Sequence, residues 1–383
     1  MSEVGASHRQ YRLTGDSKGR YRVNPTAILR NAGQSLWLDN ITRDLLDNGA
    51  LRRYVLDYAV TGLTSNPTIF DHAIKNTNAY DGDILKATAL GKSPQDVFFE
   101  LALADITRAA DLFREVYDRT NGVDGWVSLE VPPALAHDAR GTLEAAADLH
   151  ARAARPNVYI KIPGTAEGLV AIEESIFAGI PINVTLLFSP EQYVAAAEAY
   201  LRGNQRRIAG GFRPDISSVA SVFISRWDVA VEDKVSKELR GRLGTAVAAR
   251  VYQAYQHLLV DPRGQAAYNF GVRPQRLLWA STGTKDPKAS DTFYVDALVA
   301  PFTVNTMPET TLKAYADHGL LGQAMDVDEM RSEELLQEFA VAGIDVADLG
   351  SQLQEEGARS FTKSWDELMN VISSKASALK RAG

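Results

Sequence analysis

The sequence predicts a closed (β/α)8 barrel, the TIM-barrel fold, with extra helices and a C-terminal helical extension. The first observation is a set of eight short apolar segments typical of strands, at residues 35–39, 62–65, 126–131, 158–162, 182–188, 219–224, 277–281 and 300–305. The second is that helical patterns lie between most of them, and this alternation favours parallel strands joined by right-handed crossovers. Eight such units are enough to close a barrel. A doubly wound open sheet is the alternative, but no G-x-G-x-x-G motif opens the first helix.

The clearest helical patterns follow the strands in order, at residues 93–119, 139–154, 190–202, 228–259 and 309–315. An additional helix at residues 81–90 joins 93–119 between the second and third strands, outside the simple repeat. The last part of the chain, residues 329–382, has a helical pattern and is expected to pack on the barrel. The first residues are polar. We therefore expect a leader at 1–31, a catalytic barrel at 32–328 and a helical extension at 329–383.

The composition excludes several classes of function. The chain has 383 residues, 45% hydrophobic and 23% charged, and it contains no cysteine, so disulfides, thiolate metal sites and cysteine nucleophiles are ruled out. Its net charge of −7 argues against nucleic-acid or anionic-membrane partners. No apolar stretch is long enough to span a membrane, and the leader lacks a signal-peptide core. We expect a cytoplasmic protein.

Polar side chains stand at the predicted strand ends, which is where the active sites of such barrels lie. In chain order they are Asp39, Asn66, Glu130, Lys161, Asn183, Thr185, Ser221, Arg226 and Lys285. Two have simple structural alternatives. Asn66 precedes a proline, which is a common helix start, and Arg226 has an acid nearby, Asp228, with which it can pair.

Lys161 is the most informative of these residues. It lies inside an apolar run that ends at a Pro-Gly turn, and burial disfavours the charged form of a lysine amine. A neutral amine attacks carbonyl carbons, so the pattern indicates Schiff-base chemistry on a polyol or sugar. The alternative is a lysine that extends to water or pairs with a carboxylate. Glu130 alternates with Ser128 along its strand, so its side chain points into the barrel, where it needs a partner or a catalytic role.

Together these segments resemble the transaldolases, Schiff-base enzymes of the non-oxidative pentose phosphate pathway. The matching stretches occur in the family's order and spacing, at residues 37–39, 64–70, 127–131, 160–163 with Thr165, 183–189 and 221–226. The resemblance covers residues 36 to about 378. The layout is most similar to the longer bacterial members that carry a C-terminal helical extension.

The resemblance implies a role for each candidate residue. Lys161 corresponds to the Schiff-base lysine, and Asp39 to the acid/base that handles the C4 hydroxyl proton. Glu130 and Thr185 correspond to the pair that holds a catalytic water. The remaining positions are implied to bind substrate: Asn66 and Asn183 the dihydroxyacetone hydroxyls, and Ser221 and Arg226 the phosphate.

The seventh strand departs from the family pattern. Many members carry an arginine there as a second phosphate cation, whereas this chain has Lys285 in a loop of different length. We place Lys285 in that role, although lysine cannot bind phosphate bidentately.

The resemblance implies sugar-phosphate substrates, no metal and no cofactor. The histidines show no ligand-type spacing, and no P-loop or nicotinamide fingerprint is present. A monomer or a homodimer is expected. Two other functions stay open: a class I aldolase that releases free dihydroxyacetone, and an inactive sugar-phosphate-binding protein. Phe223 favours the transferase, because related aldolases tend to have tyrosine there. A coupled transfer assay discriminates the three.

Overall fold

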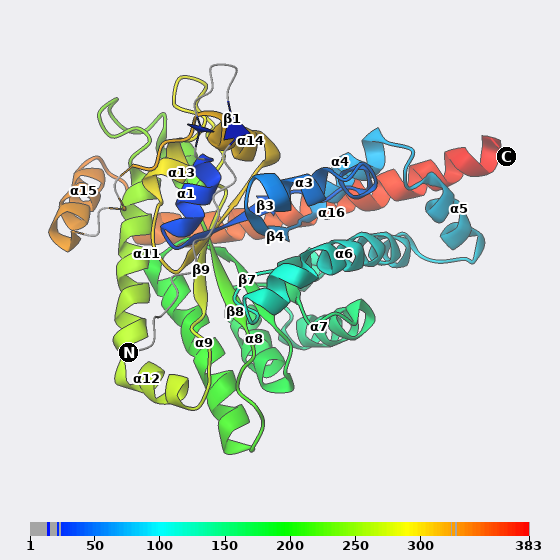
Figure 1. Cartoon of the computed structure of the whole chain (residues 1–383), viewed down its shortest axis with the longest axis horizontal. Coiled ribbons are helices and arrows are strands. Elements are labelled where there is room, and N and C mark those ends of the chain that lie inside the picture. Colours follow the sequence, from blue (N-terminus) through cyan, green and yellow to red (C-terminus); the bar gives the residue numbers. More distant parts are fainter. Residues whose placement is uncertain (1–13, 16–20, 23, 323, 326–327, 383) are drawn as a thin grey trace, which may run out of the picture.

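The computed structural model describes residues 14–15, 21–22, 24–322, 324–325 and 328–382, and its centre is a closed parallel barrel (Figure 1). Strand β10 pairs with β3 and so closes the ring, which confirms the predicted fold and excludes the open sheet. The strands are β3 (Gln34–Asp39), β4 (Val60–Thr64), β5 (Trp126–Glu130), β6 (Val158–Pro163), β7 (Ile182–Leu187), β8 (Ser218–Phe223), β9 (Arg276–Ala280) and β10 (Thr303–Met307).

Helices surround this barrel, and several begin with a polar capping residue followed by proline. Asn66, Ser93, Ser189 and Asp261 each accept a hydrogen bond from the first turn of the helix they cap, and a proline follows each of them. The helices are α1 (Pro25–Asn31), α2 (Arg43–Asp47), α3 (Ala50–Asp57), α4 (Pro67–Asn76), α5 (Asp81–Ala89), α6 (Pro94–Arg119), the 3₁₀ turn η1 (Pro133–Leu135), α7 (Ala139–Ala153), α8 (Ala166–Ala178), α9 (Pro190–Ala209), α10 (Ser225–Val231), α11 (Leu243–Val260), α12 (Pro262–Asn269), α13 (Phe293–Ala297), α14 (Glu309–His318), α15 (Glu329–Val341) and α16 (Val346–Ala382).

Two predicted elements are wrong in detail. The helix expected at residues 228–259 is two helices, α10 and α11, separated by turns that include Gly241 at a φ of 70°. The last strand was expected at 300–305 and is observed at Thr303–Met307. Phe302, just before it, has a φ of 60°, so the backbone turns there and the extended segment begins one residue later. The shift brings Thr306 into the barrel.

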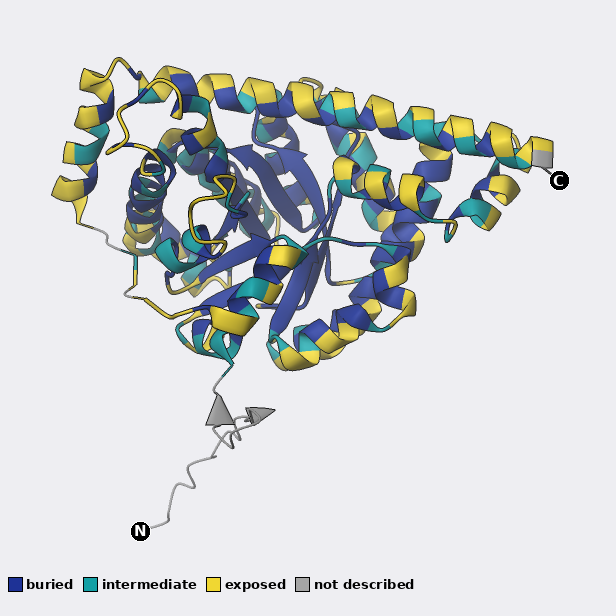
Figure 2. Cartoon of the chain, turned by 90° about the horizontal axis from the view of Figure 1, so that it is seen from above, coloured by how far each residue is buried: buried dark blue, intermediate teal, exposed yellow. Residues whose placement is uncertain are grey.

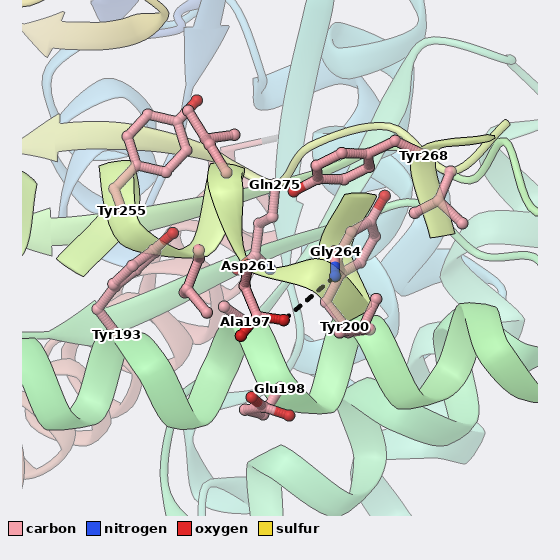
Figure 3. A pocket seen from close by; sticks show the side chains of 13 residues that line it. Tyr193, Ala197, Glu198, Tyr200, Tyr255, Asp261, Gly264, Tyr268 and Gln275 are labelled. Carbon is pink, nitrogen blue, oxygen red and sulfur yellow. Dashed lines mark hydrogen bonds between the residues drawn. The ribbon is translucent and has the colours of Figure 1, made fainter. Parts of the chain in front are cut away.

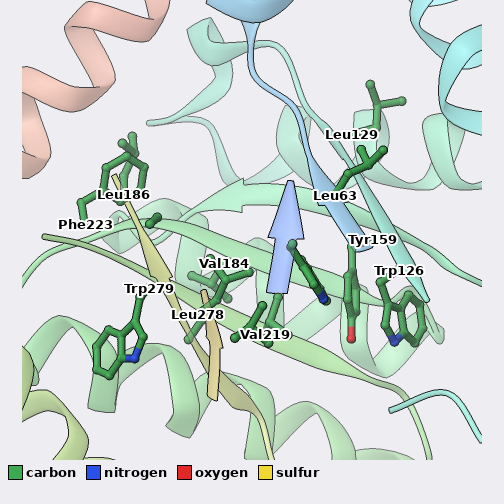
Figure 4. Packing of buried hydrophobic residues seen from close by; sticks show 14 of the residues in the cluster. Leu63, Trp126, Leu129, Tyr159, Val184, Leu186, Val219, Phe223, Leu278 and Trp279 are labelled. Carbon is green, nitrogen blue, oxygen red and sulfur yellow. The ribbon is translucent and has the colours of Figure 1, made fainter. Parts of the chain in front are cut away.

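The barrel interior is aromatic at its amino end and polar at its carboxyl end. Residues in register on parallel strands share a face, and the pairs Gly62–Trp126 and Ser128–Tyr159 place two large rings inside. The rings of Trp126 and Tyr159 stack with centroids 3.9 Å apart (Figure 4). Gly62 leaves room for a third ring, because a Cβ there would lie 2.7 Å from the Trp37 indole. This packed layer separates the polar side chains at the carboxyl end from those at the amino end, such as Ser35 and Asp124.

The C-terminal helix α16 lies along the barrel and packs on α4, α5 and α6 (Figure 1). Its inner face is buried and its outer face is exposed (Figure 2). The extension is not one helix, since α15 and α16 are separated by a turn at Gly343, whose φ is 86°. Of the predicted leader, the structure describes a short β1–β2 pair (Thr14–Gly15 and Tyr21–Arg22) and residues 24–31, which include α1. None of the described helices combines the length and apolarity needed to cross a membrane.

Candidate active site

A cavity of about 140 Å³ opens at the carboxyl end of the barrel, where the polar strand ends meet. Eight of the predicted site residues line it: Asp39, Asn66, Lys161, Thr185, Ser221, Phe223, Arg226 and Lys285. The other two, Glu130 and Asn183, lie buried beneath it. These residues are separated by up to 246 positions along the chain (285 − 39). The barrel therefore assembles the predicted set in one place.

Lys161 and Glu130 form a buried ion pair at the base of this cavity. They are in register on β6 and β5, so their side chains share a face, and Nζ of Lys161 lies 3.1 Å from Oε2 of Glu130. Nζ also donates a hydrogen bond of 3.0 Å to the carbonyl of Ser65. The amine is thus buried as predicted, but its surroundings include a carboxylate that stabilises its charged form. A proton acceptor therefore lies in contact with the amine.

The two carboxyl groups of the site both have a raised pKa. Burial raises the pKa of Asp39, and Lys161 and a hydrogen bond from Thr64 oppose the shift. Burial likewise raises the pKa of Glu130, against the effect of Lys161. Oδ1 of Asp39 accepts a hydrogen bond of 2.7 Å from Oγ1 of Thr64. Both carboxyl groups can therefore hold a proton closer to neutral pH than an exposed carboxyl, as an acid/base catalyst requires.

Asn183 belongs to a hydrogen-bonded chain beneath the cavity. Its amide donates to Oγ of Ser128 at 3.1 Å, and its carbonyl accepts from Oγ of Ser221 at 2.7 Å. Thr185, two residues on, is buried, and its Oγ1 has no hydrogen-bond partner among the described residues. The Oε2 atom of Glu130 has its contact with Nζ of Lys161 and no other polar partner within the described chain. Both oxygens retain capacity for a bound water or substrate hydroxyl.

Asn66 is at once a helix cap and a cavity residue. Its Oδ1 accepts a hydrogen bond of 3.1 Å from the backbone of Ile69, which fixes the start of α4. This hydrogen bond orients the side-chain amide of Asn66, because the helix binds only the amide oxygen. The structural and functional interpretations of Asn66 are compatible.

Arg226 supplies a cation at the rim of the cavity. It does not pair with Asp228, whose carboxylate binds Tyr294 and the backbone of Gly244 instead. The guanidinium lies 5.0 Å from the centre of the Phe223 ring, a distance typical of a cation–π contact. Burial lowers the pKa of Arg226, but from so high a value that the group stays charged. Lys285 also lines the cavity and is exposed to solvent.

Seven residues that line the cavity are missing from the predicted site: Thr64, Ala280, Ser281, Gly283, Thr306, Pro308 and Phe361. Thr306 bonds to Thr64 with their Oγ1 atoms 2.7 Å apart, and the misplaced eighth strand had excluded it. The available signal was the polar residue itself, which lies near the carboxyl end of its strand as the predicted site residues do. Phe361 comes from α16, and nothing in a helical repeat marks which of its apolar residues faces a cavity.

Two other hollows in the described chain lie away from this end of the barrel. A tyrosine-lined pocket near α9 and α12 has a volume of about 30 Å³, which is too small for a sugar phosphate (Figure 3). A larger one, of about 580 Å³, lies at the amino end near Ser35 and Arg276, and the Arg276 guanidinium there is bound by Ser35, Asp124 and backbone carbonyls. Neither contains a predicted site residue.

Comparison with known proteins gives a consistent result. Residues 36–372 match the family described as Transaldolase/Fructose-6-phosphate aldolase. A "Transaldolase" of Saccharopolyspora erythraea is 44% identical over 351 residues, which cover 90% of this chain and 95% of that protein. A "Transaldolase" of Frankia alni is 41% identical over 94% of this chain and 99% of its own length. A "Transaldolase 2" of a Nostoc species is 38% identical over 93% and 99%.

Proposed function

The chain belongs to the transaldolase/fructose-6-phosphate aldolase family, and we propose that it transfers a dihydroxyacetone unit through a Schiff base on Lys161. In one direction, sedoheptulose 7-phosphate donates this unit to glyceraldehyde 3-phosphate, which gives erythrose 4-phosphate and fructose 6-phosphate. The reaction is reversible. The observation that carries the assignment of residues is the buried Lys161–Glu130 pair, held in one cavity with Asp39 and Arg226. This arrangement combines a nucleophile, two acid/base groups and an anion-binding cation.

The first chemical step is formation of the Schiff base. Lys161 must lose a proton before it attacks the ketose carbonyl, and Glu130 lies 3.1 Å away to receive it. Loss of water from the carbinolamine then requires an acid, and the same carboxyl can return the proton through a water held with Thr185. The raised pKa of Glu130 favours this exchange in both directions.

Cleavage of the C3–C4 bond is the second step. The iminium on Lys161 accepts the bonding electrons, and Asp39 takes the proton of the C4 hydroxyl. Asp39 stands on β3, which β4 separates from the strand that carries Glu130, and the hydrogen bond from Thr64 orients its carboxylate. The aldose product leaves, and the three-carbon enamine stays bound until an acceptor aldehyde arrives. Because Asp39 and Glu130 stand on different strands, each carboxyl group handles a different proton.

The test is a transfer assay with fructose 6-phosphate and erythrose 4-phosphate. We expect sedoheptulose 7-phosphate to form with little free dihydroxyacetone. Continuous release of dihydroxyacetone without an acceptor would instead identify an aldolase. Tight substrate binding without turnover would identify a binding protein. A monomeric or homodimeric enzyme and a cytoplasmic location stay predictions, of which light scattering tests the first.

Replacing Glu130 by glutamine is expected to slow formation of the Schiff base by about 10²- to 10⁴-fold. The amide keeps the shape of the side chain but cannot accept the lysine proton. The measurement is the pre-steady-state rate at which a borohydride-trappable adduct appears. Adduct formation at the parental rate, with a defect only in later steps, would contradict the role of Glu130.

Replacing Arg226 by alanine is expected to raise KM for fructose 6-phosphate by about 10- to 100-fold, the cost of charge-assisted hydrogen bonds to a phosphate. KM for unphosphorylated fructose is expected to change far less. Lys285→Ala should show the same pattern more weakly, since Lys285 is exposed and its charge is screened. Arg213→Ala, an exposed arginine before β8, is the control. Equal losses for both sugars would show that Arg226 shapes the cavity and does not bind phosphate.

A further inference from the structure

Among the described residues that line the cavity, Phe361 alone lies outside the barrel, residues 32–328. It lies on α16 and is buried, with 6% of its surface exposed. The centre of its ring is 6.0 Å from Nζ of Lys161 and 5.8 Å from the guanidinium carbon of Arg226. An apolar ring therefore stands beside both the reacting nitrogen and the cation.

Helix α16 is fixed at this place by polar contacts to the barrel. The side-chain amide of Gln354 donates hydrogen bonds to the carbonyls of Gly164 (3.1 Å) and Leu186 (2.9 Å), at the ends of β6 and β7. Leu186 has a φ of 56°, a strained conformation that persists only where the surrounding structure fixes it. Gln354 thus binds the backbone immediately after Thr185.

Gly357 allows the helix to lie close to the site. A Cβ at this position would lie 2.9 Å from Leu186 and 3.2 Å from Nη1 of Arg226. The next turn of the helix then brings Phe361 over the cavity, because residues four apart share a helix face. The position of the ring follows from the docking of this part of α16.

The bound three-carbon intermediate has two fates. Its enamine carbon can attack an acceptor aldehyde, which forms the new C–C bond. Alternatively, that carbon takes a proton from solvent to regenerate the iminium, and one water molecule then adds to the iminium carbon. The C–N bond to Lys161 breaks, and free dihydroxyacetone leaves. Both fates end with the hydrolysis of an iminium on Lys161, so they diverge earlier, at the enamine carbon. Only the second fate needs a proton delivered to that carbon from solvent, so exclusion of water from the intermediate, whose enamine carbon lies two bonds from Nζ, selects between them.

We propose that Phe361 is a specificity-determining residue that keeps water from the intermediate on Lys161 and so favours transfer over hydrolytic release. The inference rests on the proposed function. It adds a residue of the C-terminal helix to a site otherwise built from the barrel. The ring covers one side of the reacting nitrogen with apolar surface.

The test compares product partition in Phe361→Ala and the parent. With fructose 6-phosphate alone, the parent is expected to release about one equivalent of glyceraldehyde 3-phosphate and then stop. Phe361→Ala is expected to continue releasing glyceraldehyde 3-phosphate. With erythrose 4-phosphate present, its ratio of free dihydroxyacetone to sedoheptulose 7-phosphate should rise roughly tenfold over that of the parent. A change of this size is within the range of discrimination that apolar pockets achieve. Phe361→Leu keeps an apolar side chain and should show a smaller rise.

Leu368→Ala is the matched control, because it removes a fully buried side chain from the same helix outside the cavity. Its partition ratio should equal that of the parent even if its stability falls. An unchanged ratio in both Phe361 variants would overturn the inference, as would an equal rise in Leu368→Ala. If the parent itself fails to form sedoheptulose 7-phosphate, the proposed function fails, which is a distinct result.

Discussion

Lys161→Ala is expected to abolish dihydroxyacetone transfer, with a loss of at least roughly 10⁴-fold in kcat, in the range that removal of a covalent nucleophile costs. Without the amine no iminium forms, and no other group among the described cavity residues accepts the electrons of the C3–C4 bond. The coupled assay with fructose 6-phosphate and erythrose 4-phosphate measures the loss. Lys86→Ala, which removes an exposed lysine on α5, is the control and should retain parental activity.

The same variant should show a pH dependence of stability. Lys161 lowers the pKa of Glu130, so its removal raises that pKa further above the unfolded value. A carboxyl with a raised pKa binds more protons in the folded state than in the unfolded one, so the free energy of unfolding falls as pH rises through the folded pKa. The Tm of Lys161→Ala should therefore fall further below that of the parent at neutral pH than at acidic pH. A constant Tm difference across pH would contradict the buried ion pair.

Asp39→Asn is expected to lower the rate of C3–C4 cleavage by about 10²- to 10⁴-fold, because the amide cannot accept the C4 hydroxyl proton. Schiff-base formation depends on Glu130, so a six-carbon adduct should accumulate in single turnover. Borohydride reduction followed by mass measurement of the intact protein distinguishes six-carbon from three-carbon adducts.

Asp228→Asn is the control for this prediction. Asp228 is also buried and also has a pKa raised by burial, but it bonds to Tyr294 outside the cavity. It should cleave the substrate at close to the parental rate. If Asp39→Asn forms no adduct at all, the separation of roles between the two carboxyl groups is wrong.

The barrel and most of the cavity could be predicted because their signals are local. Each strand is a short apolar run with turn residues at its ends, and the polar residues at those ends stand out within a few positions. Lys161 and Glu130 were identifiable for the same reason, since each breaks an apolar alternation. Register on adjacent strands then makes them partners.

The contributions of Phe361 and Thr306 depend on information that the sequence pattern does not contain. Phe361 reaches the cavity only because α16 docks on the ends of β6 and β7 through Gln354, and that docking is tertiary. Thr306 was lost because the last strand was expected to end at residue 305, whereas it runs from Thr303 to Met307. That strand begins where Phe302 turns the backbone, a conformation that an aromatic residue rarely adopts and that composition does not indicate.

Covalent trapping identifies the residue that carries the Schiff base. The protein is incubated with fructose 6-phosphate, reduced with borohydride, digested and mapped by mass spectrometry. We expect a reduced three-carbon adduct on the peptide that contains Lys161, and no adduct in Lys161→Ala. An adduct on Lys285, Lys75 or any other lysine, or trapping that persists in Lys161→Ala, would contradict it.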